Sequence, residues 1–144
     1  MIGTAGNLTR QVWSTPLSGS GVATVPVWTA PSTSTTITSL QAPANDGDNY
    51  GDRIQGTITA PISGNYTFQV SSDENVELWV SSNAEPAHRL KRAWVVNGTV
   101  PPGSYTTLPS QTSYQMQMKA GNAYYIEAVR RETTGSDQIG RAHV

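Results

Sequence analysis

Apolar and polar residues alternate along most of the chain after Arg53, as in the run Val76-Glu77-Leu78-Trp79-Val80. Successive side chains of a β-strand point to opposite faces, so a period of two predicts strands that are buried on one face. Similar runs occupy residues 54–58, 66–70, 114–118 and 124–129.

Turn residues separate these runs, for example at Pro61-Ile62-Ser63-Gly64 and at Ala120-Gly121-Asn122. No stretch shows sustained helical spacing. Several short strands joined by turns are typical of an antiparallel β-sandwich or barrel, and we predict this all-β fold. The residues expected to form its core share the inward faces of the strands: Ile54, Ile58, Tyr66, Phe68, Val70, Leu78, Ile126 and Ala128.

The stretch between Arg10 and Asp46 contains no charged residue and is rich in Pro, Ser and Thr. Its tryptophans, Trp13 and Trp28, argue against a free linker, because a disordered linker has no use for large apolar anchors. We therefore expect an ordered, irregular segment that wraps over a sheet.

The chain has 144 residues, a length typical of one domain. Only 13% of the residues are charged and the net charge is −1, so no basic surface exists to hold nucleic acid or an anionic membrane. The 15 Ser and 18 Thr are typical of the exposed strand faces of secreted β-proteins. The lack of Cys excludes disulfides, thiolate zinc sites and cysteine nucleophiles. No apolar run is long enough to span a bilayer, so we expect no membrane insertion. The first 25 residues lack the pattern of an export signal, so we expect the signal of an exported domain to lie outside this sequence.

The last six residues, Ile139 to Val144, have an unusual property. One choice of codons for them, ATC GGA AGA GCA CAC GTC, matches the start of a widely used sequencing-library adapter. We interpret residues 139–144 as a non-native tail that makes few native contacts, and residues 1–138 as a single β domain that lacks its last strand.

Sequence signatures of enzymes are absent. There is no nucleophile elbow, no phosphate-binding loop and no pair of histidines at helical spacing, and Gly19-Ser20-Gly21 lacks the third glycine of a dinucleotide fingerprint. His88 lies among surface-type residues. We therefore predict a protein that is not an enzyme.

Three acidic clusters remain, at residues 46–52, at Asp73-Glu74-Asn75 and from Glu132 to Asp137. The first is not a helical calcium loop, because its third liganding position is Tyr50 and its twelfth position is Thr57, where such a loop needs a bidentate Glu. Each cluster taken alone is either a solvated turn or part of a cation site.

Several runs in order along the chain resemble the PA-fourteen (PA14) family, which is named for the protective antigen of a bacterial toxin. The residues that carry the resemblance lie at 48–56, 60–68, 72–79, 111–113, 120–127 and 130–137. The resemblance implies a β-sandwich or barrel module of the kind found in secreted bacterial glycosidases, adhesins and toxins and in fungal flocculation lectins. It therefore implies an extracellular or cell-surface location, within a larger parent chain that carries other domains.

Several members of this family bind sugars through a calcium ion. In these members the ion is bound by two adjacent aspartates, joined by a cis peptide, and by a later loop. The resemblance places Asp73 and Glu74 at the paired position, and Glu132 and Asp137 near the later loop. The second acid here is Glu, one methylene longer than Asp, so its carboxylate is displaced unless the backbone compensates. The alternative is a trans turn that binds no ion.

A cation with open coordination positions can accept two neighbouring sugar hydroxyls, and an aromatic ring can stack on the apolar face of the sugar. Trp79, Trp94 and Tyr105 are the candidate rings, with packing within the fold as the alternative role for each. We therefore predict a non-catalytic carbohydrate-binding or adhesion module, with glycans as partners and calcium as the expected cofactor. The alternative is a structural spacer of the same fold that has no ligand of its own.

Overall fold

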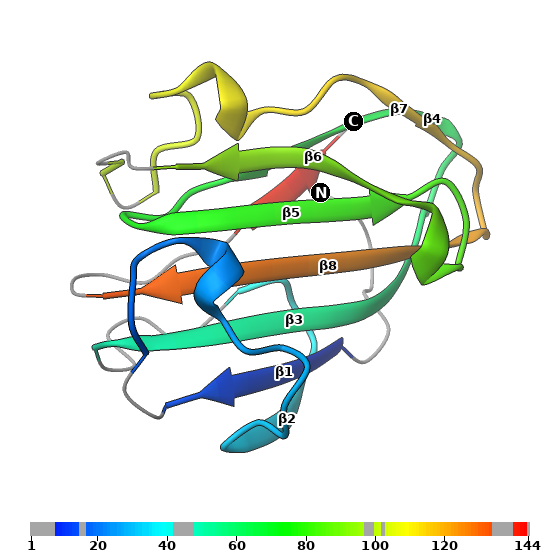
Figure 1. The fold of residues 1–144 in the computed structure, drawn as a ribbon. Helices are drawn as coiled ribbons and strands as arrows, with labels where there is room; N and C mark the ends of the chain where they lie inside the picture. Colours follow the sequence, from blue (N-terminus) through cyan, green and yellow to red (C-terminus); the bar gives the residue numbers. More distant parts are fainter. Residues whose placement is uncertain are drawn as a thin grey trace.

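Two antiparallel β-sheets pack against each other in the computed structural model of the protein (Figure 1). The structure describes residues 8–14, 17–41, 48–96, 100–101, 103–133 and the backbone of 140–143. The predicted all-β antiparallel fold is confirmed. The helical elements of the described residues are three short 3-10 turns, η1 (Val22–Thr24), η2 (Pro86–His88) and η3 (Pro109–Gln111).

The larger sheet has six strands and the smaller sheet has three. In spatial order, the larger sheet consists of β2 (Thr33–Ile37), β1 (Leu8–Trp13), β3 (Tyr50–Thr59), β8 (Ala123–Glu132), β5 (Asn75–Ser81) and β6 (Arg89–Val95). The smaller sheet consists of β7 (Met116–Met118), β4 (Gly64–Val70) and β9 (Gly140–His143). The central pair, β3 and β8, joins segments that are far apart in the sequence.

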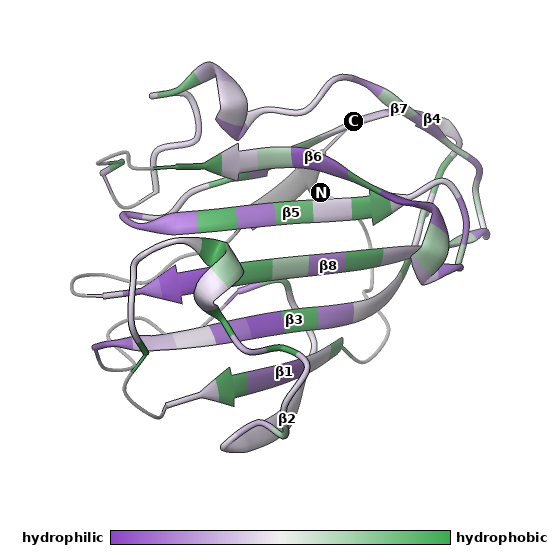
Figure 2. Cartoon of the chain, viewed as in Figure 1, coloured by the Kyte–Doolittle hydropathy of each residue, from purple (hydrophilic) through white to green (hydrophobic). Residues whose placement is uncertain are grey.

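The core lies between the two sheets, and the period-two pattern assigned its residues correctly. All eight residues predicted for the core are buried, none with more than 4% of its surface exposed. The alternation is visible along β5 and β8 in Figure 2. In β5, Leu78 points inward and is fully buried, whereas Glu77 and Trp79 are half-buried on the outer face of the larger sheet.

Residues 17–31, which we call the covering segment, run across that outer face through η1 (Figure 1). Val25 is the anchor of the covering segment and packs with Trp13 and Val129 in a second apolar cluster. Val25 lies so close to Gly51 in β3 that a Cβ at residue 51 would stand 2.6 Å from one Val25 methyl group. The described residues of the charge-free stretch are therefore ordered, and residues 17–31 lie on a sheet, as the tryptophans indicated.

We expected residues 139–144 to make few native contacts, but the described part of this stretch pairs with a strand; its interpretation as a non-native tail stays a prediction. Gly140–His143 form β9, which pairs with β4 from Val70↔Gly140 to Thr67↔His143. The hydrogen bonds of a β ladder join backbone groups, so a short segment can add to an open sheet edge with little regard to its side chains. Among the described residues, no helix has the length and apolar character needed to cross a membrane.

Candidate functional site

Described residues from all three acidic clusters meet at one end of the larger sheet, on the left in Figure 1. Asp73 and Glu74 lie in the turn between β4 and β5. Glu132 is the last residue of β8, and Thr133 follows it. The Thr133 hydroxyl donates a hydrogen bond to Glu74 Oε1. The backbone N–H of Asn49 donates a hydrogen bond of 2.9 Å to the Thr133 carbonyl oxygen. We call this region the acidic end.

The acidic end differs from the calcium site that the family resemblance implies. No peptide bond is cis among the described residues, so Asp73 and Glu74 are joined by a trans peptide. The part of the chain that the structure describes holds no group of three or more Asp, Glu or His side chains arranged to bind a metal ion. Asp137, the fourth expected ligand, lies outside the described residues. The described carboxylates alone therefore do not form a calcium pocket.

A buried arginine lies among the oxygen atoms of the acidic end. Arg131 Nη2 donates to Asn49 Oδ1 at 2.6 Å and to the Leu17 carbonyl at 3.2 Å, and Nη1 donates to the carbonyls of Tyr50, at 3.2 Å, and Glu132. Only 1% of the surface of Arg131 is exposed. This guanidinium stays charged at any pH a protein tolerates, so a positive charge already lies beside the expected ligands.

Burial and the nearby carboxylates shift the pKa of Arg131 in opposite directions. Burial lowers the pKa of Arg131, whereas the nearby charges of Glu74 and Glu132 raise it. A divalent ion bound to Glu74 and Glu132 would experience repulsion from the guanidinium that those same carboxylates stabilise. The described residues of the acidic end therefore do not fit calcium.

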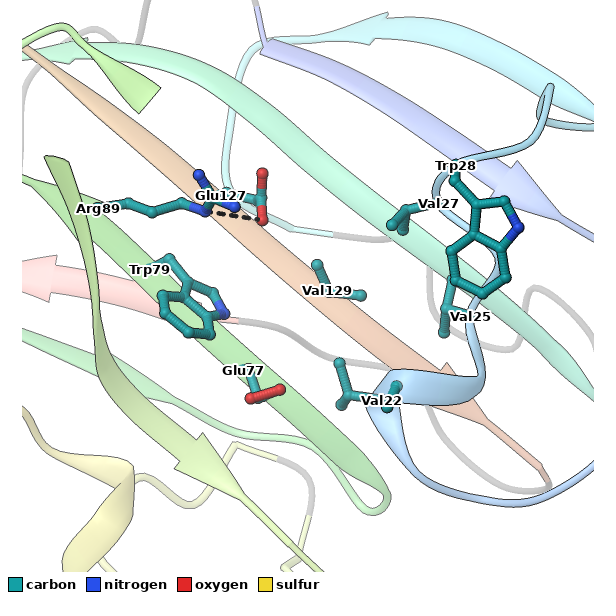
Figure 3. A pocket seen from close by; sticks show the side chains of 10 residues that line it. Val22, Val25, Val27, Trp28, Glu77, Trp79, Arg89, Glu127 and Val129 are labelled. Atoms are coloured by element: carbon teal, nitrogen blue, oxygen red, sulfur yellow. Dashed lines mark ion pairs between the residues drawn. The ribbon is translucent and has the colours of Figure 1, made fainter. Parts of the chain in front are cut away.

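A second candidate site is a pocket of about 250 Å³ on the outer face of the larger sheet, which we call the outer pocket (Figure 3). The covering segment forms one wall and strands β5 and β8 form the floor, with Arg89 contributed by the start of β6. Its lining residues are Val22, Ala23, Val25, Val27, Trp28, Glu77, Trp79, Arg89, Glu127 and Val129. Figure 3 shows Trp79 and Trp28 on opposite sides of Val129.

Strand pairing places an indole beside a carboxylate in the outer pocket. Trp79 and Glu127 are direct partners in the β5–β8 register. The Arg89 guanidinium lies 5.9 Å from the centre of the Trp79 ring, and Arg89 Nε is 3.8 Å from Glu127 Oε2. Lys91 Nζ is 3.4 Å from Glu77 Oε2. Both ion pairs are partly exposed, so water and ligands can compete for them.

Tyr125 fixes the position of the Glu127 carboxylate. Its hydroxyl donates a hydrogen bond of 2.7 Å to Glu127 Oε1 and lies 3.2 Å from Gln55 Oε1. Burial raises the pKa of Tyr125, and the hydrogen bond and charge of Glu127 raise it further. Tyr125 therefore remains a hydrogen-bond donor at neutral pH, and Glu127 Oε2 is directed toward Arg89.

The three aromatic residues predicted from the sequence have different positions. Trp79 lines the outer pocket, whereas Trp94 and Tyr105 do not. Trp94 lies opposite Glu77 across the β5–β6 pair, with Lys91 Nζ 5.1 Å from its ring centre. Tyr105 is half-buried in the connection between β6 and η3.

Sequence reasoning missed Glu77, Arg89, Glu127 and Trp28 as pocket residues. Part of the signal was present, because the alternation in β5 places Glu77 on the same face as Trp79. The alternation does not show which strand pairs with β5 or which segment covers the outer face. Both depend on the order of the strands in the sheet.

Comparison with known proteins identifies the family. The PA14 domain family matches residues 26–140. Over 113 residues, 76% of this chain, the sequence is 36% identical to mouse N-acetyl-beta-glucosaminyl-glycoprotein 4-beta-N-acetylgalactosaminyltransferase 1, of whose length it spans 11%.

Solved structures share the fold at low sequence identity. The A domain of epithelial adhesin 6 from Candida glabrata, in complex with Galβ1-3GlcNAc, has a TM-score of 0.66 and 10% identity, covering 100% of this chain and 82% of the adhesin domain. A β-glucosidase from Kluyveromyces marxianus, in complex with glucose, has a TM-score of 0.62 and 13% identity, covering 94% of this chain and 15% of the glucosidase. The family match extends over most of the chain and agrees with the two-sheet fold, and this protein therefore belongs to the PA14 domain family.

Proposed function

We propose that this domain is a non-catalytic carbohydrate-binding module and that it binds one sugar residue of a glycan in the outer pocket. The observation that carries this proposal is the pairing of Trp79 with Glu127 in the β5–β8 register, which sets an indole ring beside a carboxylate at the floor of a pocket.

A sugar ring has an apolar face of C–H groups and an edge of hydroxyl groups. The indole of Trp79 suits the apolar face, and the carboxylates of Glu77 and Glu127 accept hydrogen bonds from hydroxyls. Arg89 supplies donors for the hydroxyl or ring oxygens. The valines of the covering segment exclude water from one side of the ring.

The size of the outer pocket limits what it encloses. Its volume of about 250 Å³ is below the range of about 300–1,000 Å³ that is usual for drug-sized ligands. We expect one sugar residue to fill the pocket while the rest of the glycan lies along the exposed surface near Trp28, of which 75% is exposed.

The names of similar proteins support a glycan as the ligand class. The adhesin domain is a complex with a disaccharide, the β-glucosidase is a complex with glucose, and the curated relative is named for transfer to a glycoprotein. Because this chain spans 11% of that relative, we also propose that it is one domain of a larger protein, located outside the cell or at its surface. The alternative remains a structural spacer of the same fold.

A glycan array with the wild-type protein and two variants tests the proposal. Wild-type protein should bind a defined set of glycans, and Trp79→Ala should lose that binding because the stacking surface is removed. Trp94→Ala is the matched control, since Trp94 lies on the same sheet face but outside the pocket, and it should retain binding. Absence of any bound glycan would favour the spacer alternative. Equal binding by Trp79→Ala and wild type would exclude the outer pocket as the site.

A further inference from the structure

We infer that the guanidinium of Arg131 is the built-in cation of the acidic end and takes the place of a bound calcium ion. The inference goes beyond the proposed function and does not depend on it, because it concerns charge balance at the end of the sheet and not the outer pocket.

The oxygen atoms around Arg131 form the kind of shell that a hard cation would otherwise need. Three are backbone carbonyl oxygens, from Leu17, Tyr50 and Glu132, and the fourth is the side-chain oxygen of Asn49. Calcium prefers carbonyl, amide and carboxylate oxygens of this type. Here the N–H groups of a planar guanidinium occupy the shell.

The charges point to the same conclusion. Glu132 is fully buried and Glu74 is half-buried, and both act on Arg131 as nearby negative charges. Buried charges are retained where opposite charges and hydrogen bonds compensate them. Arg131 supplies that compensation from within the chain.

The same arginine also holds the covering segment. Its bond to the Leu17 carbonyl joins β8 to the residues just before η1, and Asn75, the register partner of Arg131, donates to the Ser20 carbonyl at 2.6 Å. Hydrogen bonds within the chain therefore attach the residues that lead into the wall of the outer pocket to β8 and β5. Glycan binding, where it occurs, should be the same with and without a calcium chelator.

The first experiment is thermal unfolding of wild-type protein in three conditions: about 5 mM calcium, the same concentration of magnesium, and a chelator. This calcium concentration lies above the dissociation constants of weak extracellular calcium sites. The expected result is a Tm that differs by less than about 1 °C among the three conditions, because an ion that does not bind cannot stabilise the fold. A calcium-specific rise of several degrees would overturn the inference.

The second experiment tests the charge itself with Glu74→Gln in two backgrounds. In wild-type protein this substitution removes a negative charge that acts on Arg131 and should lower Tm. In Arg131→Met, which keeps an apolar stem of similar reach but no charge, it should raise Tm, because it removes an uncompensated carboxylate. A change of the same sign and size in both backgrounds would contradict the inference.

A third background guards against loss of folding. In Arg131→Lys the positive charge is kept, so Glu74→Gln should again lower Tm; a rise there would contradict the inference. If Arg131→Met does not fold, the lysine background and the calcium titration decide the question. None of these readouts requires a glycan, so they are unaffected by failure of the proposed function.

Discussion

Asp52 and Arg130 face each other across the two central strands of the larger sheet and form a two-pronged ion pair inside the core. The two bonds measure 3.1 Å and 2.8 Å, and both residues are fully buried. Arg10 adds a third bond to Asp52 at 2.9 Å, and the Tyr50 hydroxyl accepts one from Arg130 at 2.8 Å. One end of the core is therefore built from compensated charges.

Asp52→Asn should destabilise the fold strongly. The substitution keeps the shape of the side chain but leaves two buried arginines without their counter-charge, a change that costs about 3–5 kcal/mol in comparable buried pairs. Urea unfolding gives the free energy directly. Asp48→Asn, at an exposed position, is the control and should change the free energy of unfolding by less than about 0.5 kcal/mol. A loss below about 1 kcal/mol for Asp52→Asn would show that the pair is not needed.

Gly51→Ala should displace the covering segment. The new methyl group would lie 2.6 and 2.7 Å from the two methyl groups of Val25, so Val25 must move. We expect a loss of about 1–3 kcal/mol in the free energy of unfolding, as for other overpacked sites, together with weaker glycan binding. Gly21→Ala is the matched control, because nothing lies within 4 Å of its added Cβ. Similar effects of the two substitutions would argue against close docking of Val25.

Glu127→Gln should weaken binding of the glycan that the array identifies. A hydrogen bond to a charged acceptor contributes about 1.5–3 kcal/mol, so the affinity should fall by about 10-fold to 100-fold. Isothermal titration calorimetry provides the measurement. Glu85→Gln, exposed and outside the pocket lining, should leave the affinity unchanged. Unchanged affinity in Glu127→Gln would remove this carboxylate from the site.

Tyr125 should make the fold less stable at high pH. Its folded-state pKa is raised above the ordinary value of 10.0, so above about pH 10 the unfolded chain loses the phenolic proton more readily than the folded chain does. The stabilisation is complete below that pH and declines as the pH rises. Unfolding measured in urea across this range should show a smaller decline for Tyr125→Phe than for wild type. Tyr114→Phe, at a site that is 96% exposed, should match wild type.

The strands and their inward faces could be predicted because burial repeats every second residue. The pattern succeeds for Leu78 and Phe68, but it places Tyr114 inward with Met116, whereas the strand begins only at Met116 and Tyr114 is exposed. The alternation of apolar and polar residues shows which face of a strand a residue lies on. Where the strand begins or ends depends on which neighbouring strand is available to pair with it.

The candidate sites depended on pairings that no local pattern contains. Trp79 and Glu127 become neighbours only because β5 pairs with β8. In the sequence Arg130 and Arg131 resemble the polar end of a strand, yet both are buried. The Asp52 carboxylate compensates the charge of Arg130, and the carbonyl oxygens of Leu17 and Tyr50 accept hydrogen bonds from Arg131. Calcium was expected because the family resemblance places Asp73 and Glu74 at the paired position and Glu132 and Asp137 near the later loop. The sequence does not show that the Arg131 guanidinium lies among oxygen atoms at the same end of the sheet, because this depends on how the strands pair.

The outer pocket takes its floor and its wall from different stretches of the chain. The floor belongs to strands whose opposite faces build the core. The wall, residues 22–28, packs on the sheet through Val25, with Val22 and Val27 beside it. The wall residues are therefore less constrained by the core than Trp79 and Glu127, which lie on strands of the sandwich. We expect exchanges of the wall residues other than Val25 to change the ligand preference and to leave the core of the sandwich intact, which would let one scaffold of this kind supply a range of binding modules.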